Sequence, residues 1–380
     1  MTKILIPIET SIGERRVSAT PETVKKLKNL GCDVYIEKSA GELSGFKDFS
    51  YEESGGIIFT KQDFNHWKEA DIIFCIHCPE YEKLNKLKEG CLIIGLLNPF
   101  ANKDLAKILS DLKLSAIALE LLPRISRAQS SDVLSSQANI AGYKSVLLAA
   151  SELDRYFPML MTAAGTVQPA KVVVLGGGVA GLQAVATAKR LGALVFVSDI
   201  RPAVKEQVES LGAKFINLPE IDEKPSESGG YAKAVSTKFL EEQRAILSKH
   251  LSEADVAICT AQVLGKKAPI LIDDKMLENM RTGSVVVDLA VAQGGNCVHT
   301  KQNQIVIKNG VKLIGASELP ASVPYHASSL YSKNLISLIT PFINNGILNI
   351  NKNDEIILGC LISDKGAILQ EKVFEIGGSN

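Results

Sequence analysis

Short apolar runs alternate with amphipathic stretches along most of this 380-residue chain. The runs are apolar at nearly every position, which is typical of strands buried on both faces, as in a parallel sheet. We expect strands at Lys3–Ile8, Asp33–Ile36, Asp71–Ile76, Cys91–Leu97, Ser115–Leu121, Lys171–Leu175, Leu194–Ser198, Lys214–Leu218, Val256–Ala261 and Ser284–Leu289. We expect helices at Thr23–Leu30, Gly181–Leu191, Ala203–Leu211, Thr237–His250 and Asp274–Met280. This alternation indicates βαβ units and doubly wound α/β sheets.

The length of the chain and one long helix indicate two domains. A chain of 380 residues is too long for one ordinary core. Gln137–Leu153 predicts a helix with few charges, placed to cross between two series of strands. The tail predicts a helix at Ser322–Phe342 and a strand at Glu355–Leu361. We expect a discontinuous first domain, 1–136 plus 318–380, and a second domain, 137–317.

Composition excludes several classes of protein. Because 42 basic residues balance 42 acidic ones, there is no electrostatic reason to expect nucleic-acid binding. Seven scattered cysteines do not form a disulfide framework and favour a reducing cytoplasm. The beginning of the chain reads as a strand and not as a signal peptide. The longest apolar run, Val172–Ala188, is interrupted by three glycines, so we expect no transmembrane segment.

The strongest motif follows the strand Lys171–Leu175. Gly176, Gly178 and Gly181 form G-x-G-x-x-G at the start of a helix, and Asp199 ends the next strand. This context is that of the dinucleotide fingerprint, in which the helix N-terminus binds the pyrophosphate. Asp199 would accept hydrogen bonds from the ribose hydroxyls, which favours NAD(H), although Arg201 is of a kind that also binds a 2′-phosphate. The fold class we predict is α/β, with two Rossmann-like doubly wound parallel-sheet domains and a cleft between them.

Four further features leave alternatives open. The polar segment Pro123–Asn139 is either a ligand-binding stretch between two domains or an ordinary linker. Asp288–Asn296 is either a strand-ending turn or part of the nicotinamide end of the site. The polar stretch Pro219–Ala232 is either an insertion or a lid carrying Tyr231. Cys75-Ile-His77-Cys78 resembles half a metal site, but no second cluster completes it, so we favour a buried strand end and expect no metal.

With these residues assembled, the chain resembles the soluble NAD(H)-binding α subunit, domain I, of proton-translocating NAD(P) transhydrogenase. The resemblance covers essentially the whole length. It rests on the stretches Glu14–Pro21, Pro123–Tyr143, Gly176–Arg201 and Ala327–Leu335.

The resemblance implies roles for particular side chains. Arg124 would bind the pyrophosphate, Gln129 would help to position the two nicotinamide rings, and Asp132 and Ser135 would hold the carboxamide and ribose. These four residues are the candidates for the reaction itself. Motif and resemblance together imply cofactor contacts from Arg124, Ile125, Ser126, Gln129, Ser130, Ser131, Asp132, Ser135, Gly176, Gly177, Gly178, Val179, Gly181, Asp199, Ile200, Arg201, Gly230, Tyr231, Gln243 and Gln262. Gln262 and Ala292 depart from residues common in the family.

Alanine dehydrogenase shares the fold that the resemblance implies, and two positions separate the enzymes. His77 stands where that enzyme has the lysine that holds pyruvate, and Asn98 stands where it has its proton-carrying histidine. Oxidation of an amino acid needs such groups, whereas hydride exchange between two nicotinamides needs only positioning. We therefore expect a transhydrogenase subunit. An alanine-dehydrogenase-type enzyme and a non-catalytic NAD-sensing module are the alternatives.

The resemblance also implies partners. The family's α subunit forms a homodimer, and it works with membrane-embedded subunits and a subunit that carries NADP(H). We expect a cytoplasmic location, peripheral on the inner face of the membrane, with hydride transfer coupled to proton translocation. The chain stops where domain I ends, which implies that the remaining subunits are encoded separately.

Overall fold

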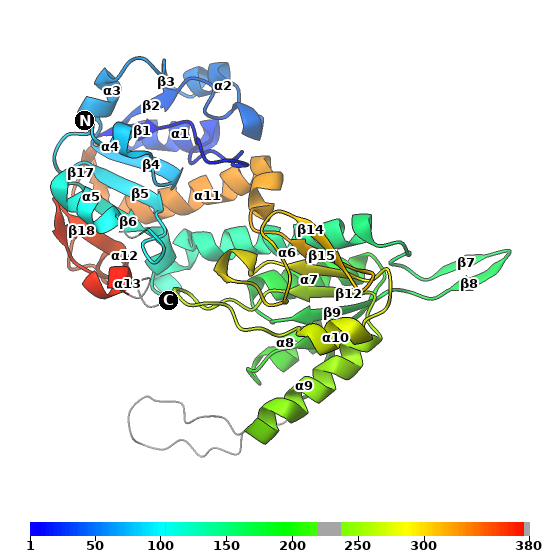
Figure 1. Ribbon diagram of the computed structural model, residues 1–380. Coiled ribbons are helices and arrows are strands. Elements are labelled where there is room, and N and C mark those ends of the chain that lie inside the picture. The colour runs from blue at the N-terminus through cyan, green and yellow to red at the C-terminus, as the bar shows by residue number, and fades with distance from the viewer. Residues whose placement is uncertain (103, 219–236, 376–380) are drawn as a thin grey trace. The chain divides into compact units, whose positions relative to one another are not determined.

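The computed structural model describes residues 1–102, 104–218 and 237–375 (Figure 1). The chain divides into two compact units, Met1–Ala138 with Pro320–Asn380, and Asn139–Leu319. The predicted boundaries lie two residues from these, at 136 and 317 against 138 and 319. Each unit contains one large sheet and its covering helices. We call them unit 1 and unit 2.

Unit 1 is built on an eight-stranded sheet in the order β19-β18-β6-β5-β4-β1-β2-β3. Its strands are β1 (Lys3–Ile6), β2 (Asp33–Glu37), β3 (Ile57–Phe59), β4 (Ile72–His77), β5 (Leu92–Leu96), β6 (Ser115–Ala118), β18 (Leu361–Asp364) and β19 (Ala367–Ile368). Strands β1 to β6 are parallel, with β1 between β4 and β2, and β18 runs antiparallel beside β6. This is the doubly wound order 3-2-1-4-5-6 with two strands added.

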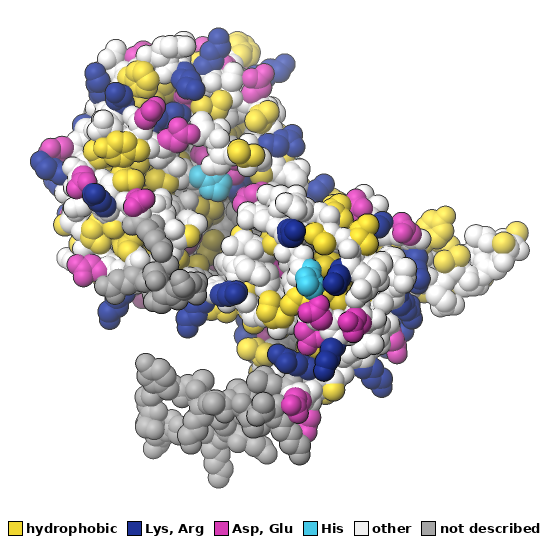
Figure 2. Space-filling view, viewed as in Figure 1, with side chains coloured by type: hydrophobic (Ala, Val, Ile, Leu, Met, Phe, Trp, Pro, Cys, Tyr) yellow, Lys and Arg dark blue, Asp and Glu magenta, His cyan; other side chains and the backbone are white. Residues whose placement is uncertain are grey.

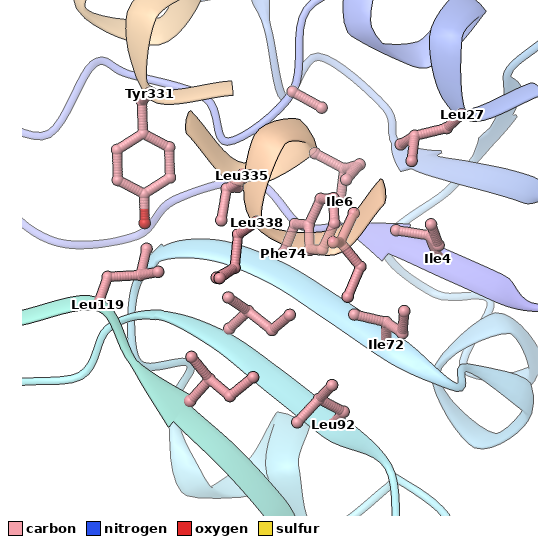
Figure 3. Packing of buried hydrophobic residues seen from close by; sticks show 14 of the residues in the cluster. Ile4, Ile6, Leu27, Ile72, Phe74, Leu92, Leu119, Tyr331, Leu335 and Leu338 are labelled. Atoms are coloured by element: carbon pink, nitrogen blue, oxygen red, sulfur yellow. The ribbon is translucent and has the colours of Figure 1, made fainter. Parts of the chain in front are cut away.

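Helices and apolar side chains cover both faces of this sheet. The helices of unit 1 are α1 (Pro21–Asn29), α2 (Asp48–Glu53), α3 (Asn65–Glu69), α4 (Tyr81–Leu84), α5 (Leu105–Asp111), α11 (Pro324–Ile339), α12 (Glu355–Cys360) and α13 (Glu371–Glu375). Figure 3 shows α11 placing Tyr331, Leu335 and Leu338 over Ile6 and Phe74 of the sheet. Alternate residues of the same strands face the opposite core, which explains why the strands read as continuous apolar runs.

Unit 2 contains a seven-stranded sheet in the order β11-β10-β9-β12-β13-β15-β14. Its strands are β9 (Lys171–Leu175), β10 (Leu194–Ser198), β11 (Lys214–Phe215), β12 (Val256–Cys259), β13 (Val285–Asp288), β14 (Ile305–Lys308) and β15 (Val311–Gly315). Its helices are α7 (Val179–Arg190), α8 (Val204–Ser210), α9 (Thr237–Ser252), α10 (Asp274–Asn279) and all but the start of α6 (Val133–Glu152). Helices α6, α7 and α8 cover one face and α9 and α10 the other.

In the seven-stranded sheet of unit 2, the parallel strands again follow the order 3-2-1-4-5-6, and β14 runs antiparallel to β15. Strand order therefore reverses between β9 and β12, which pair directly. In such sheets ligands bind at the carboxyl ends of the strands next to this reversal. The predicted fold class, with two Rossmann-like doubly wound sheets, is confirmed.

One local prediction is wrong, and one hairpin was not predicted. Glu355–Leu361 was expected to be a strand, but residues 355–360 form α12 and the strand β18 begins at Leu361. The Asp354 carboxylate caps this helix by accepting the backbone N–H of Ile356 at 2.9 Å, and Glu355 lies in its first turn. The sequence did not predict the hairpin of β7 (Leu160–Thr162) and β8 (Gly165–Val167), which projects from the sheet of unit 2 in Figure 1.

Surface charge matches the composition. On the face shown in Figure 2, acidic and basic side chains are interspersed over both units. Within the described ranges, none of the helices combines the length and the apolar character that crossing a bilayer takes.

Candidate functional site

The turn between β9 and α7 has a backbone that only glycine can adopt. Gly176 has φ of +105°, and its N–H donates to the carbonyl oxygen of Ser198 at 2.8 Å. A Cβ atom at Gly181 would overlap the Gly176 carbonyl oxygen, so this glycine allows the helix to pack against the turn. Thr260, at the end of β12, donates its hydroxyl to the Gly176 carbonyl at 2.9 Å. Gly176 and Gly181 therefore meet the steric requirements of the dinucleotide fingerprint.

Gly177 and Gly178 differ in what surrounds them. A side chain at Gly177 would overlap Val204 of α8, whereas the space that a Cβ of Gly178 would occupy is open. Gly178 precedes α7, a helix of 12 residues whose first N–H groups have no partner within the helix. Open space at a long helix N-terminus fits a pyrophosphate, which is attracted by the unpaired N–H groups and the helix dipole.

Asp199 lies at the carboxyl end of β10 with its side chain only 6% exposed. Its Oδ2 accepts the N–H of Gly177 at 2.6 Å and Nη2 of Arg201 at 3.0 Å. Its Oδ1 accepts the backbone N–H of Arg201 at 2.8 Å and Nε of Arg201 at 3.0 Å. Burial raises the pKa of this carboxyl, but the hydrogen bonds from Arg201 and Gly177 outweigh burial and hold the pKa below its usual value. The carboxylate is therefore ionised at neutral pH, as ribose binding requires.

The other residues of unit 2 that were predicted to contact the cofactor differ in how exposed they are. Val179 and Ile200 follow the glycine turn and Asp199, and both are exposed apolar side chains, with Ile200 83% exposed. Gln262 is exposed and donates Nε2 to the Leu289 carbonyl at 2.6 Å. Gln243 is half-buried on α9. Gly230 and Tyr231 lie outside the described residues, as does the whole of Pro219–Ala232.

In unit 1, the segment after Pro123 is a fixed turn of helix. Residues Ser126–Ser131 form a 3₁₀ helix whose Ala128 is buried in the core. Arg127 pairs through both guanidinium arms with Asp354, at 2.6 and 2.9 Å. Asn334 of α11 donates to the carbonyl of Ser130 at 2.7 Å. These contacts favour an ordered surface over a loose linker.

This anchoring leaves several predicted residues facing solvent. Arg124 and Gln129 are exposed, and neither side chain hydrogen-bonds to another described residue. Ser126 and Ser130 are exposed as well, Ile125 packs against the core of unit 1, and Ser131 is buried. Arg124 and Gln129 thus present a cation and an amide that are free to bind a ligand.

Asp132 and Ser135 bond to each other at the start of α6. The Asp132 Oδ1 accepts the backbone N–H of Ser135 at 2.9 Å, and its Oδ2 accepts the Ser135 hydroxyl at 2.6 Å. This is an N-cap, since the side chain satisfies an N–H at the third helical position. Both side chains remain only partly buried, so ligand contact is compatible with the cap.

Asp288 has a structural role. It is fully buried, and its oxygens accept the backbone N–H groups of Ala290, Asn296 and Cys297, at 2.8 to 3.0 Å, and the Thr300 hydroxyl at 2.9 Å. The four donors fix the turn after β13 and use the lone pairs of the carboxylate. The turn interpretation of Asp288–Asn296 is therefore the one that the contacts support.

A polar cluster in unit 1 was not predicted. Glu14 accepts the Nε and Nη2 atoms of Arg16 at 2.8 and 2.6 Å, and the His77 Nε2 lies 2.8 Å from its Oε2. Arg16 also donates to Gln137 at 2.9 Å. Burial lowers the pKa of His77, but the Glu14 carboxylate, with that of Glu9, outweighs it and raises the pKa. The Glu14 carboxylate thus favours the protonated form of His77.

Two half-buried acids complete this cluster after the carboxyl ends of β1 and β6. Glu9 accepts the N–H groups of Ile76 and His77 at 2.6 and 3.2 Å, and burial raises the pKa of Glu9 to about 7. Glu120 accepts the N–H of Asn98 at 2.6 Å, and burial raises its pKa as well. Only strand order brings these acids together, so no local sequence signal could identify the cluster.

The cysteines next to His77 are core residues. Cys75 is fully buried, its thiol points to the Ile94 carbonyl at 3.5 Å, and burial raises its pKa. Burial raises the pKa of Cys78 to about 12. A metal ligand must be a thiolate, so these contacts support the prediction of a strand end.

Comparison with known proteins agrees with this geometry. Residues 5–141 match the family model "Alanine dehydrogenase/PNT, N-terminal domain", and residues 145–371 match "Alanine dehydrogenase/PNT, C-terminal domain". The chain is 44% identical over 375 residues to an NAD(P) transhydrogenase subunit alpha chain of Rhodospirillum rubrum, covering 97% of both chains. The chain belongs to the alanine dehydrogenase/PNT family, together with the NAD(P) transhydrogenase α subunits.

Solved structures of this family share the fold over the whole chain. A transhydrogenase from Sinorhizobium meliloti superposes with a TM-score of 0.86 at 40% identity, covering 96% of this chain and 99% of that one. An L-alanine dehydrogenase superposes with a TM-score of 0.82 at 27% identity, covering 99% of both. The predicted resemblance is thereby confirmed, with the transhydrogenases more similar in sequence than the alanine dehydrogenases.

The two positions that separate the branches of the family lie at the ends of β4 and β5. His77 ends β4, where it binds Glu14. Asn98 follows β5 with φ of +49°, a left-handed conformation that asparagine tolerates better than most residues. Position 77 therefore carries no lysine and position 98 no histidine, the two residues that the resemblance to alanine dehydrogenase would require there.

Proposed function

We propose that this chain binds NAD(H) through Gly176–Asp199 and transfers hydride directly between NADH and NADP+ held by a partner subunit. The observation that carries the proposal is the open space at Gly178, at the N-terminus of α7, with the buried Asp199 carboxylate beside the same turn. Transhydrogenase α subunits 40–44% identical to this chain support the reaction.

The ribose end of the site favours NAD(H). Asp199 is ionised and tied to the glycine turn through the N–H of Gly177. A carboxylate can accept the hydroxyls of a ribose, whereas it repels a 2′-phosphate. NADP(H) is accordingly assigned to the partner.

At the nicotinamide end, the proposal uses Arg124, Gln129, Asp132 and Ser135 for positioning. Bound NADH supplies the hydride, and the exchange requires no proton transfer to or from a side chain. Gln129 would orient the ring through its free amide, and Arg124 would bind the pyrophosphate. Asp132 and Ser135, whose pairing fixes the start of α6, would hold the carboxamide and ribose. Fixed geometry of this kind is what hydride transfer between two rings demands.

We propose that this chain acts together with other subunits. Relatives named as α subunits imply other subunits, and we assign the NADP(H) site and the membrane-embedded, proton-translocating part to them. The chain would act as a homodimer on the cytoplasmic face of the membrane. The reaction would have the Si/Re stereospecificity of the proton-translocating enzyme and would need those subunits for activity.

One experiment separates the candidate functions. The purified chain is mixed with the NADP(H)-binding domain of a transhydrogenase, and hydride exchange between nicotinamide analogues is followed by absorbance. We expect exchange that depends on both proteins. Pyruvate-dependent NADH oxidation by the chain alone, without exchange, would contradict the proposal and identify an alanine-dehydrogenase activity. NADH binding with neither activity would indicate a sensor.

A further inference from the structure

The two oxygens of Asp199 already have four hydrogen-bond donors. Two of these donors belong to the backbone, the N–H groups of Gly177 and Arg201, and are fixed by the fold. The other two are Nε and Nη2 of the Arg201 side chain, one on each oxygen, both at 3.0 Å. A carboxylate has about four lone-pair sites, so Asp199 has none to spare in this conformation.

The two side-chain donors are the displaceable ones. The Arg201 side chain is 56% exposed, whereas that of Asp199 is 6% exposed. Withdrawal of the guanidinium costs little, because the exposed Arg201 side chain is solvated by water and Asp199 keeps its two backbone donors. Withdrawal of the guanidinium frees one lone pair on each oxygen, which is what a vicinal diol such as the 2′- and 3′-hydroxyls of a ribose needs.

We propose that Arg201 occupies the ribose site of Asp199 as a displaceable substitute and thereby sets the preference between NAD(H) and NADP(H). This inference rests on the proposed NAD(H) site. With NAD(H), the ribose hydroxyls must displace the guanidinium, which lowers affinity. With NADP(H), the freed guanidinium pairs with the 2′-phosphate, which partly offsets the repulsion from Asp199. The same side chain therefore acts in opposite directions on the two cofactors.

The test measures NADH and NADPH binding to the full chain by titration calorimetry at low salt. For Arg201→Ala, we expect NADH to bind about twofold to fivefold more tightly, because the guanidinium no longer competes with the ribose hydroxyls for Asp199. NADPH should bind about fivefold to tenfold more weakly, because a charged hydrogen-bond partner of its phosphate is lost. Arg201→Lys keeps the charge but not the two-armed geometry, so it should retain NADPH binding and tighten NADH by a smaller factor.

Salt and a matched variant distinguish competition from a structural effect. The gain in NADH affinity should shrink at high salt, since salt screens the attraction between the exposed Arg201 guanidinium and Asp199 in the wild type. Arg190→Ala removes an exposed arginine at the far end of α7 and should leave the NADH to NADPH ratio unchanged. If Arg201→Ala weakens NADH binding or leaves it unchanged, the inference is overturned. If the wild-type chain binds no NADH at all, the proposed function fails with it.

Discussion

Ser135 donates its hydroxyl to Asp132 at 2.6 Å, while Asp132 also caps α6 through the backbone N–H of Ser135. Two residues proposed to hold a ligand thus also hold the start of a helix. Asp132→Ala should lower the free energy of unfolding by about 1 kcal/mol, the usual effect of losing an N-cap. Asp132→Asn should have little effect, because asparagine caps equally well. Urea denaturation measures both, and equal stability of the alanine variant would contradict the capping role.

The same pair has a kinetic consequence. Asp132→Asn keeps the cap but gives up a charged acceptor, and Gln129→Asn shortens an exposed amide by one methylene. Both should slow hydride exchange with the partner domain while leaving NADH affinity within about tenfold, or roughly 1.4 kcal/mol. Single-turnover exchange and calorimetry separate the two quantities. A larger loss of affinity would mean that these side chains bind the cofactor rather than position it.

The glycine turn offers a matched pair of variants. Gly181→Ala places a Cβ against the Gly176 carbonyl, so it should unfold the turn and lower the melting temperature. Gly178→Ala meets open space at φ of −76°, so the free protein should be as stable as the wild type. If the pyrophosphate approaches this backbone, Gly178→Ala should still lose at least about tenfold in NADH affinity, since the added methyl stands in its place. Unchanged affinity would place the pyrophosphate elsewhere.

The sequence predicted those parts of the structure that are determined by residues close together in the chain. The apolar runs located the central strands, and the glycine spacing with Asp199 located the turn, because a strand, a turn and a helix N-terminus lie within one short stretch of sequence. A short apolar run fits the period of a strand as well as that of a helix, so the sequence did not show that Ile356-Ile357-Leu358 is helical. The N-cap from Asp354 favours the helix.

These local signals could not predict contacts between segments that lie far apart in the sequence. Arg127 is paired with Asp354, 227 residues away. Glu9 and Glu120 are brought to one edge of a sheet only by its strand order. The pattern of polar residues after Pro123 therefore left open whether this segment is a linker, whereas the contacts with α11 and Asp354 hold it in place.

Asp288 provides a test of a structural role. All four of its partners are donors, so Asp288→Asn would turn an amide N–H toward at least one of them. We expect a loss of about 2–4 kcal/mol in the free energy of unfolding, since buried donors lose their acceptor. Glu278→Gln, an exposed acid on α10, is the control and should change little. Wild-type stability of Asp288→Asn, combined with slowed hydride exchange, would instead support a role at the nicotinamide.

Glu9 should make stability depend on pH. Burial raises its pKa to about 7 in the folded protein, against an ordinary value of 4.5, so the folded state keeps a proton that the unfolded chain has released. Its contribution to the free energy of unfolding is therefore fully present below pH 4.5 and is lost as the pH rises to about 7. We expect the loss to be about 1–3 kcal/mol.

The difference between variants isolates this effect. His77 also has a raised pKa, so its contribution to the free energy of unfolding is likewise lost as the pH rises. The dependence of the wild-type free energy of unfolding on pH therefore contains both groups. Glu9→Gln should remove only the contribution of Glu9. The free energy of unfolding should then fall less steeply between pH 4.5 and 7 than it does in the wild type. Glu82→Gln, an exposed acid on α4, should leave the slope as in the wild type. Urea unfolding at half-unit pH intervals gives the slopes, and equal slopes for Glu9→Gln and wild type would mean that Glu9 is ionised in the folded protein throughout this range.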